Sequence, residues 1–320
     1  MSHLHPFIVY AFFGMLAGSA LAGLVTRLPG LSPEVRRGVW WVPLAVPFVL
    51  YAASWAWRWR LACWVPLLAG RGFAGVFLAW LCRAGTVLGH VLAPFFAVSL
   101  VVGVGKAIAG AVLVGRLRRH FRPEPDESRV TLTLRAVAER MGVRPPAVMV
   151  VPRPVSQAFT AGLMHPVVIL SRPLVEKLDP EELEAVLAHE LAHVGAGDHW
   201  KKWLAATARD ILLFTGLSPS AFRRLQAETE AMADTASARV TGRPLALAAA
   251  LLKGYRLGTA GGWWQLALDN FSSLSGAGEL QRRVEALLQG SAQSGPRAGK
   301  GRWLVPAVWL LTGAILVPLC

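Results

Sequence analysis

A helix is signalled most clearly by residues 179–197, which read DPEELEAVLAHELAHVGAG. Asp179 is a typical helix N-cap, Pro180 suits the first helical position, and Glu182 stands three residues after the cap, as in a capping box. Leucine and valine then recur at helical spacing, which predicts one apolar face. Two glycines at the end of the stretch mark the point where this helix stops.

The sequence HELAH lies inside this predicted helix and has the spacing of a metal site. Residues four apart differ by about 40° around a helix axis, so His189 and His193 face one way and can share one ion. Zinc binds neutral imidazole nitrogen at about 2.0–2.1 Å. Glu190 is turned by about 100° from His189, so we expect it to act as a general base toward water rather than as a ligand. The motif predicts one zinc ion per chain.

A third ligand is expected from a second helix, predicted over residues 218–241 between a Ser-Pro start and a Thr-Gly end. Glu230 and Asp234 are four residues apart and share a face of this helix. Glu230 is the predicted ligand, and Asp234 is predicted to support a ligand from behind. Glu228 faces away from both and is predicted to be a solvated or supporting residue.

A competing third ligand is His199, at the place where the pattern HExxHxxGxxH puts its last histidine. That pattern needs glycine at position 196 to turn the chain back toward the metal, and this chain has Ala196. Glu230 is therefore favoured over His199. Asp198 is expected to hydrogen-bond near one of the metal-binding imidazoles.

The remainder of residues 121–300 predicts a mostly helical α+β domain with a small β-sheet. The pattern indicates a helix over 130–141 and strands over 147–151, 157–163 and 167–171. The last two strands flank His165-Pro166, which indicates a hairpin. An extended substrate would pair with the edge of the first hairpin strand. The candidate substrate-binding residues there are Ala158, Phe159, Thr160, Ala161 and Gly162.

The composition indicates a membrane protein, because 54% of the residues are hydrophobic and only 16% are charged, against about 25% charged in soluble proteins. Apolar runs long enough to span a bilayer lie at about 6–26, 39–57 and 86–114, and a short one lies within 301–320. The first run lacks a basic segment before it, so we expect a span rather than a cleavable signal peptide. Residues 61–82 are broken by Gly70-Arg71-Gly72, which favours an interfacial segment, with an extra span as the alternative.

The formal net charge of +14 is concentrated beside the apolar runs, most clearly in the arginines of residues 116–122. Positive charge flanking a span favours the cytoplasmic side and anionic lipid head groups. We therefore expect a membrane domain over 1–120, a cytoplasmic zinc domain over 121–300 and a final transmembrane helix over 301–320. Nucleic acid is not an expected partner. The three cysteines form no CxxC pair, which argues against a cysteine zinc site.

Four segments resemble the BlaR/MecR-type membrane zinc metallopeptidases, which sense β-lactams in some bacteria. They are LMHPVVIL at 163–170, LDPEEL at 178–183, the stretch 186–198, and AETEAMAD at 227–234. The resemblance covers roughly residues 80 to 320. It implies a gluzincin-type endopeptidase in a bacterial inner membrane, acting on a protein or peptide substrate. His189, His193 and Glu230 would hold zinc, with Glu190 as the base.

Two alternatives stay open beside this reading. The HtpX and CAAX prenyl-protease family shares the HExxH motif, the later aspartate and the glutamate helix, and would imply a processing or quality-control peptidase. A zinc-stabilised scaffold or signalling partner with little turnover is the non-enzyme alternative, although Glu190 argues against it, since a structural site needs no base. Family sensors carry a penicillin-binding domain after the last span, and the sequence ends at Cys320, so antibiotic sensing is not part of the expectation.

Overall fold

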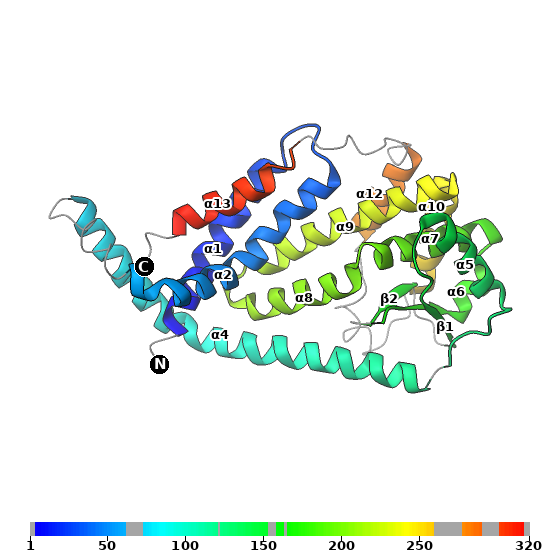
Figure 1. Ribbon diagram of the computed structural model, residues 1–320, viewed down its shortest axis with the longest axis horizontal. Helices are drawn as coiled ribbons and strands as arrows, with labels where there is room; N and C mark the ends of the chain where they lie inside the picture. The colour runs from blue at the N-terminus through cyan, green and yellow to red at the C-terminus, as the bar shows by residue number, and fades with distance from the viewer. Residues whose placement is uncertain are drawn as a thin grey trace. The chain divides into compact units, whose positions relative to one another are not determined.

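The computed structural model of this protein describes residues 4–61, 73–120, 122–152, 158–162, 165–258, 277–289 and 301–316. The chain divides into two compact units. The first contains residues 1–104, 205–225 and 298–320, and the second contains residues 105–204 and 226–297. Helices form most of both units (Figure 1).

The first unit is built around α1 (Leu4–Val25), α2 (Pro33–Leu61) and α13 (Leu304–Leu316), which pack on one another (Figure 1). Their core is apolar, with Ile8 and Leu44 fully buried. Residues 205–225, which include the 3-10 helix η1 (Leu213–Thr215), add further side chains to the same core.

Two helices among the described residues contain a stretch long and apolar enough to cross a bilayer, Phe7–Val25 and Gly89–His120, and Leu304–Ala314 is a shorter apolar helix. The first two agree with predicted spans at 6–26 and 86–114. The predicted span at 39–57 lies within α2, which contains two prolines but stays helical. The Gly-Arg-Gly break in the predicted 61–82 segment lies outside the described residues. The number of spans and the side of the membrane therefore remain predictions.

A three-stranded sheet forms part of the second unit, with the order β1-β3-β2. Strand β2 (Phe159–Ala161) runs antiparallel to β3 (Val167–Ser171), with Thr160 opposite Val168. This confirms the predicted hairpin, although β2 is shorter than predicted. Strand β1 (Ala147–Val151) pairs in parallel with β3, and this pairing was not predicted. Strand β2 therefore lies at an edge of the sheet.

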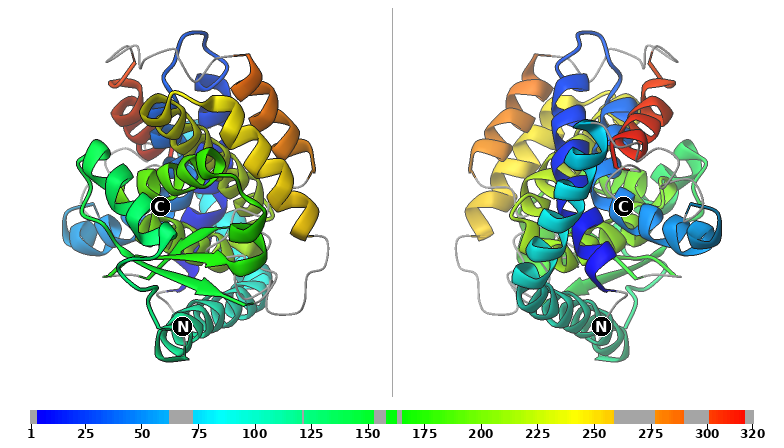
Figure 2. Two further views of the ribbon diagram at one scale, coloured as in Figure 1. Left: turned by 90° about the vertical axis from the view of Figure 1, so that its right-hand side faces the viewer. Right: turned by 90° about the vertical axis from the view of Figure 1, so that its left-hand side faces the viewer.

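The sheet is covered on both faces, because its side chains alternate between two apolar clusters. Val168 and Leu170 face α5 (Arg129–Met141) and α7 (Pro180–Gly195). The intervening residues, including Phe159 and Ile169, pack with Val114, which lies in the last part of α4 (Phe73–His120). Figure 2 (left) shows the strands between these helical layers. Thr160, whose neighbours point toward α4, thus points toward α7.

Helix α7 begins and ends as its sequence predicts. Asp179 is its N-cap, and the Glu182 carboxylate accepts a hydrogen bond from the Asp179 backbone N–H at 2.9 Å, which completes a capping box. The helix ends at Gly195, and Gly197 adopts a φ of +65°, a left-handed conformation that favours glycine. Helix α8 (Asp198–Ile211) starts at the next residue. This tight turn places Asp198 beside the last turn of α7.

Three further helices surround α7 in the second unit. Helix α10 (Pro244–Gly258) packs on α7, and α12 (Ala277–Leu288) packs on α10. The last part of α9 (Ser218–Thr241) joins them, because the Ser237 hydroxyl donates to the Ala185 carbonyl of α7 at 2.7 Å in a buried position. Leu287 of α12 is buried in the cluster that these helices share. The chain therefore brings α7, α9 and α12 to one place.

Candidate metal centre

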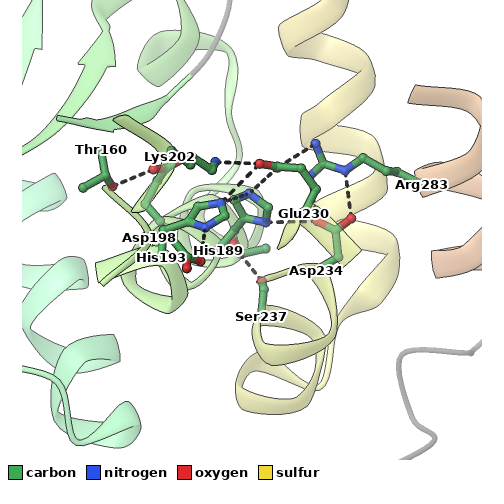
Figure 3. A network of polar contacts seen from close by, with 11 residues as sticks. Thr160, His189, His193, Asp198, Lys202, Glu230, Asp234, Ser237 and Arg283 are labelled. Carbon is green, nitrogen blue, oxygen red and sulfur yellow. Dashed lines mark hydrogen bonds and ion pairs between the residues drawn. The ribbon is translucent and has the colours of Figure 1, made fainter. Parts of the chain in front are cut away.

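Three buried side chains from α7 and α9 converge on one point (Figure 3). The Nε2 atoms of His189 and His193 lie 3.2 Å apart. The Glu230 carboxylate lies 3.3 Å from Nε2 of His189 and 3.5 Å from Nε2 of His193. Two imidazole nitrogens and a carboxylate oxygen thus face a shared space, which is the donor set of a metal-binding group.

The spacing of these atoms fits a tetrahedral ion. In a tetrahedron the edge is about 1.63 times the bond length, so ligands at about 2.0–2.1 Å stand about 3.3–3.4 Å from one another. The two Nε2 atoms are 3.2 Å apart, and Oε2 of Glu230 is 3.3 Å from Nε2 of His189, both close to that value. The 3.5 Å contact of His193 is with the other oxygen, Oε1. The residues present therefore fit a small divalent cation held by three protein ligands, with a fourth position for water or substrate.

Each histidine is oriented by a second carboxylate. Nδ1 of His189 lies 3.0 Å from Oδ1 of Asp234, and Nδ1 of His193 lies 3.1 Å from Oδ2 of Asp198. A carboxylate only accepts hydrogen bonds, so Nδ1 of His193 donates its proton to Asp198. Nδ1 of His189 lies within ion-pair distance of Asp234. Both Nε2 atoms face the centre. This arrangement is typical of metal-binding histidines. All four side chains are buried.

Two cationic side chains contact the acidic residues of α9 (Figure 3). Lys202 Nζ lies 2.7 Å from Oε1 of Glu230. Arg283, from α12, makes a two-point contact with Asp234 at 2.8 and 2.6 Å, and its Nη1 lies 3.2 Å from Glu230. Burial opposes ionisation of Glu230, yet Lys202, His193 and Arg283 hold its pKa well below the usual range. The pKa of Asp234 is also lowered, against the effect of burial, chiefly by Arg283.

The environment of His189 favours positive charge at the centre. Burial lowers the pKa of this imidazole, but its hydrogen bonds to Asp234 and Glu230 outweigh burial and raise the pKa to about 9. Four buried carboxylates surround the centre, those of Glu190, Asp198, Glu230 and Asp234, against the cations Lys202 and Arg283. The buried carboxylates thus outnumber these cationic side chains, which favours a cation at the centre.

The Glu190 carboxylate belongs to the same helix as the two histidines but does not join their group of three. Its Oε2 accepts a hydrogen bond from the Thr160 hydroxyl of β2 at 2.8 Å, and both side chains are buried. Glu190 is thus fixed beside the centre by the edge strand of the sheet. Glu190 is therefore not placed among the three candidate ligands, and its action on water stays a prediction.

The other residues singled out in the sequence take clear positions. His199 lies in the first turn of α8, and within the described part of the chain it is not a member of the group of three; nor is Glu228. The candidate substrate-binding stretch 158–162 forms β2 and its flanks. Phe159 and Ala161 point into the buried cluster below the sheet, so their side chains are not available to a substrate.

Lys202 and Arg283 were not recognised in the sequence, although a signal for each exists there. Arg283 falls between Leu280 and Leu287 on the apolar stripe of α12, whereas its neighbour Arg282 does not. Lys202 lies one turn after Asp198 in α8, and the next turn on the same face contains the buried residues Ala205 and Ala206. A basic residue at an apolar position of an amphipathic helix indicates a buried acidic partner.

Comparison with known proteins relates the chain to peptidases. A family model described as BlaR1 peptidase M56 matches residues 84–287. A protease HtpX homolog of Thermococcus kodakarensis is 31% identical in an alignment of 156 residues that covers 38% of this chain and 54% of that protein. For a protease HtpX homolog of Pyrococcus furiosus the identity is 30% in an alignment of 152 residues that covers 37% of this chain and 53% of that protein. The chain thus spans about half the length of these curated relatives. No solved structure matches it significantly.

Proposed function

Because the chain belongs to the BlaR1-type M56 peptidase family, we propose that it is a zinc-dependent endopeptidase whose centre is formed by His189, His193, Glu230 and Glu190. Membership of a peptidase family implies a protein or peptide substrate. The apolar helices support a membrane protein. The observation that carries the proposal is the convergence of two Nε2 atoms and the Glu230 carboxylate on one buried point, with the Glu190 carboxylate on the same helix as the two histidines.

Zinc is the proposed ion, because two imidazoles and one carboxylate are a known ligand set of catalytic zinc. When bound, the ion would polarise the scissile carbonyl and make the attacking water more acidic. His189 and His193 would hold it through Nε2, which their Nδ1 contacts to Asp234 and Asp198 leave free. Lys202 and Arg283 keep Glu230 ionised and in place.

Glu190 is the proposed general base. Its carboxylate would take a proton from water as the water oxygen bonds to the peptide carbonyl carbon. The same proton would then pass to the amide nitrogen as the C–N bond breaks, which releases a carboxylic acid and an amine. An extended substrate would add to the free edge of β2, so backbone groups rather than the buried side chains of Phe159 and Ala161 would bind it.

We further propose that residues 121–300 lie in the cytoplasm of a bacterial cell, between an N-terminal membrane domain and a final transmembrane helix. The arginines that follow the apolar part of α4 support this orientation and a contact with anionic lipid heads. The substrate would be a cytoplasmic or membrane protein. A role like that of the proteins named protease HtpX homolog is the second candidate, favoured by the similarity of about 150 residues.

The test uses purified full-length protein in detergent and a library of proteome-derived peptides, with cleavage read by mass spectrometry. The wild type should contain about one zinc per chain and cleave a subset of the peptides. Glu190→Gln should keep its zinc and lose cleavage by at least about a hundredfold. His189→Ala should lose the zinc. Full zinc in His189→Ala, or cleavage by Glu190→Gln at the wild-type rate, would overturn the proposal and favour a zinc-stabilised scaffold.

A further inference from the structure

The partner that holds Glu190 differs in kind from those that hold the candidate metal ligands. Both histidines and Glu230 are held by charged groups. Glu190 is held by a neutral hydroxyl, that of Thr160, at 2.8 Å. Thr160 is the hydrogen-bond partner that the described residues supply to this carboxylate.

The contact leaves one carboxylate oxygen for chemistry. The Thr160 hydroxyl donates to Oε2 of Glu190, and a hydrogen bond to a charged acceptor is stronger than one between neutral groups. Oε1 then remains to receive a proton. A glutamate side chain has several rotatable bonds, so a fixed Oε2 restricts the direction in which Oε1 points. General-base catalysis depends on this direction, because the base must reach the proton that it removes.

Thr160 is itself rigidly placed. It lies at the centre of β2 and is paired with Val168 of β3. Its neighbours Phe159 and Ala161 are anchored in the cluster on the opposite face of the sheet, and its branched side chain has few accessible χ1 rotamers. The hydroxyl is therefore held at a constant distance from α7 as long as β2 keeps its register.

We infer that Thr160 is a positioning residue for Glu190, so that the edge strand proposed to bind substrate also orients the proposed base. The inference rests on the proposed peptidase function. Strand β2 would then have two roles. Its backbone edge would bind the substrate strand, and the Thr160 side chain would orient the Glu190 carboxylate that acts on that substrate.

Thr160→Val and Thr160→Ser separate the hydroxyl from the shape of the side chain. Valine keeps the branched shape and loses the donor, whereas serine keeps the donor. With the best-cleaved library peptide, Thr160→Val should retain its zinc and KM and lose about tenfold to a hundredfold in kcat, the range expected for one hydrogen bond to a charged group. Thr160→Ser should recover most of that loss. Thr133→Val makes the same chemical change at an exposed hydroxyl of α5 and should match the wild type.

A spectroscopic readout tests the contact without relying on turnover. The infrared carboxylate band of Glu190, assigned by difference from Glu190→Gln, should shift in Thr160→Val and stay near its wild-type position in Thr160→Ser. An unchanged band in Thr160→Val, an unchanged kcat, or a serine variant as impaired as the valine variant would overturn the inference. If the wild type binds zinc and Thr160→Val shows the band shift, but the wild type cleaves no peptide, the proposed function is contradicted and the contact between Thr160 and Glu190 is not.

Discussion

Replacing Arg283 with methionine tests whether this residue holds the metal centre together. Methionine keeps an apolar stem of similar length and removes the guanidinium. Arg283 is 10% exposed and makes a two-point contact with Asp234, which is itself 8% exposed. Glu230 would keep Lys202 at 2.7 Å. The change therefore leaves chiefly the Asp234 carboxylate short of a partner in a buried site.

Breaking a buried ion pair by removing one partner costs about 3–5 kcal/mol. In this protein we expect that loss to lower the free energy needed to separate α12 from α9 in the second unit. Each 1.4 kcal/mol is a factor of ten, so amides protected by this packing should exchange roughly two to three and a half orders of magnitude faster. The contact of Asp234 with His189 is retained, so the upper end of that range is not expected.

The assay is backbone hydrogen exchange of α9 and α12, followed by mass spectrometry in detergent with a chelator present. The chelator matters because a bound cation would offset the unpaired carboxylate. Arg282→Met is the matched control: Arg282 is 63% exposed and pairs with Glu279 on its own helix, and a surface pair of this kind contributes about 0–1 kcal/mol. Equal exchange in the two variants would refute the argument that Arg283 stabilises the acidic pair.

Three further predictions concern the metal and the membrane. Glu230→Gln should weaken zinc binding and cleavage together, whereas His199→Ala should change neither. Metal content and cleavage are measured on the same preparations. Loss of the ion in His199→Ala alone would reverse the ligand assignment. Asp234→Asn should lower zinc affinity about 10- to 100-fold, as measured by competition with a chromogenic chelator, and an unchanged affinity would remove Asp234 from the centre. A reporter fused near Gly290 should be active only in its cytoplasmic form, and periplasmic activity would invert the proposed topology.

The elements with local signals were predictable from the sequence. Helix α7 carries its own start and stop, in Asp179, Glu182 and Gly197, because capping and left-handed turns depend on residues within a few positions. The β2–β3 hairpin was visible for the same reason. The parallel pairing of β1 with β3 was not, because parallel strands are joined by a long connection whose course no local pattern encodes.

The same distinction applies to the site. His189, Glu190 and His193 share one helix, so their relation follows from helical geometry alone. Glu230 could be proposed because a second helix with two acidic residues one turn apart is a recognisable pattern. Thr160 and Arg283 reach the centre only through tertiary packing, since one comes from a strand and the other from α12. Thr160 was singled out only as part of a substrate-binding strand, and no helical or strand spacing indicated that its hydroxyl contacts Glu190 or that Arg283 contacts Asp234.

The placement of Arg283 on α12 has a consequence for the order in which the protein is made. A ribosome adds about 5–20 residues per second, so the 94 residues from His189 to Arg283 take roughly 5–20 s to follow. In about the second half of that interval the nascent chain contains both histidines and the acidic residues of α9, but not the arginine that pairs with Asp234. The geometry described for this centre can form only once α12 has emerged and docked. If the centre holds the proposed ion, capture of that ion in this geometry would be a late step of biogenesis.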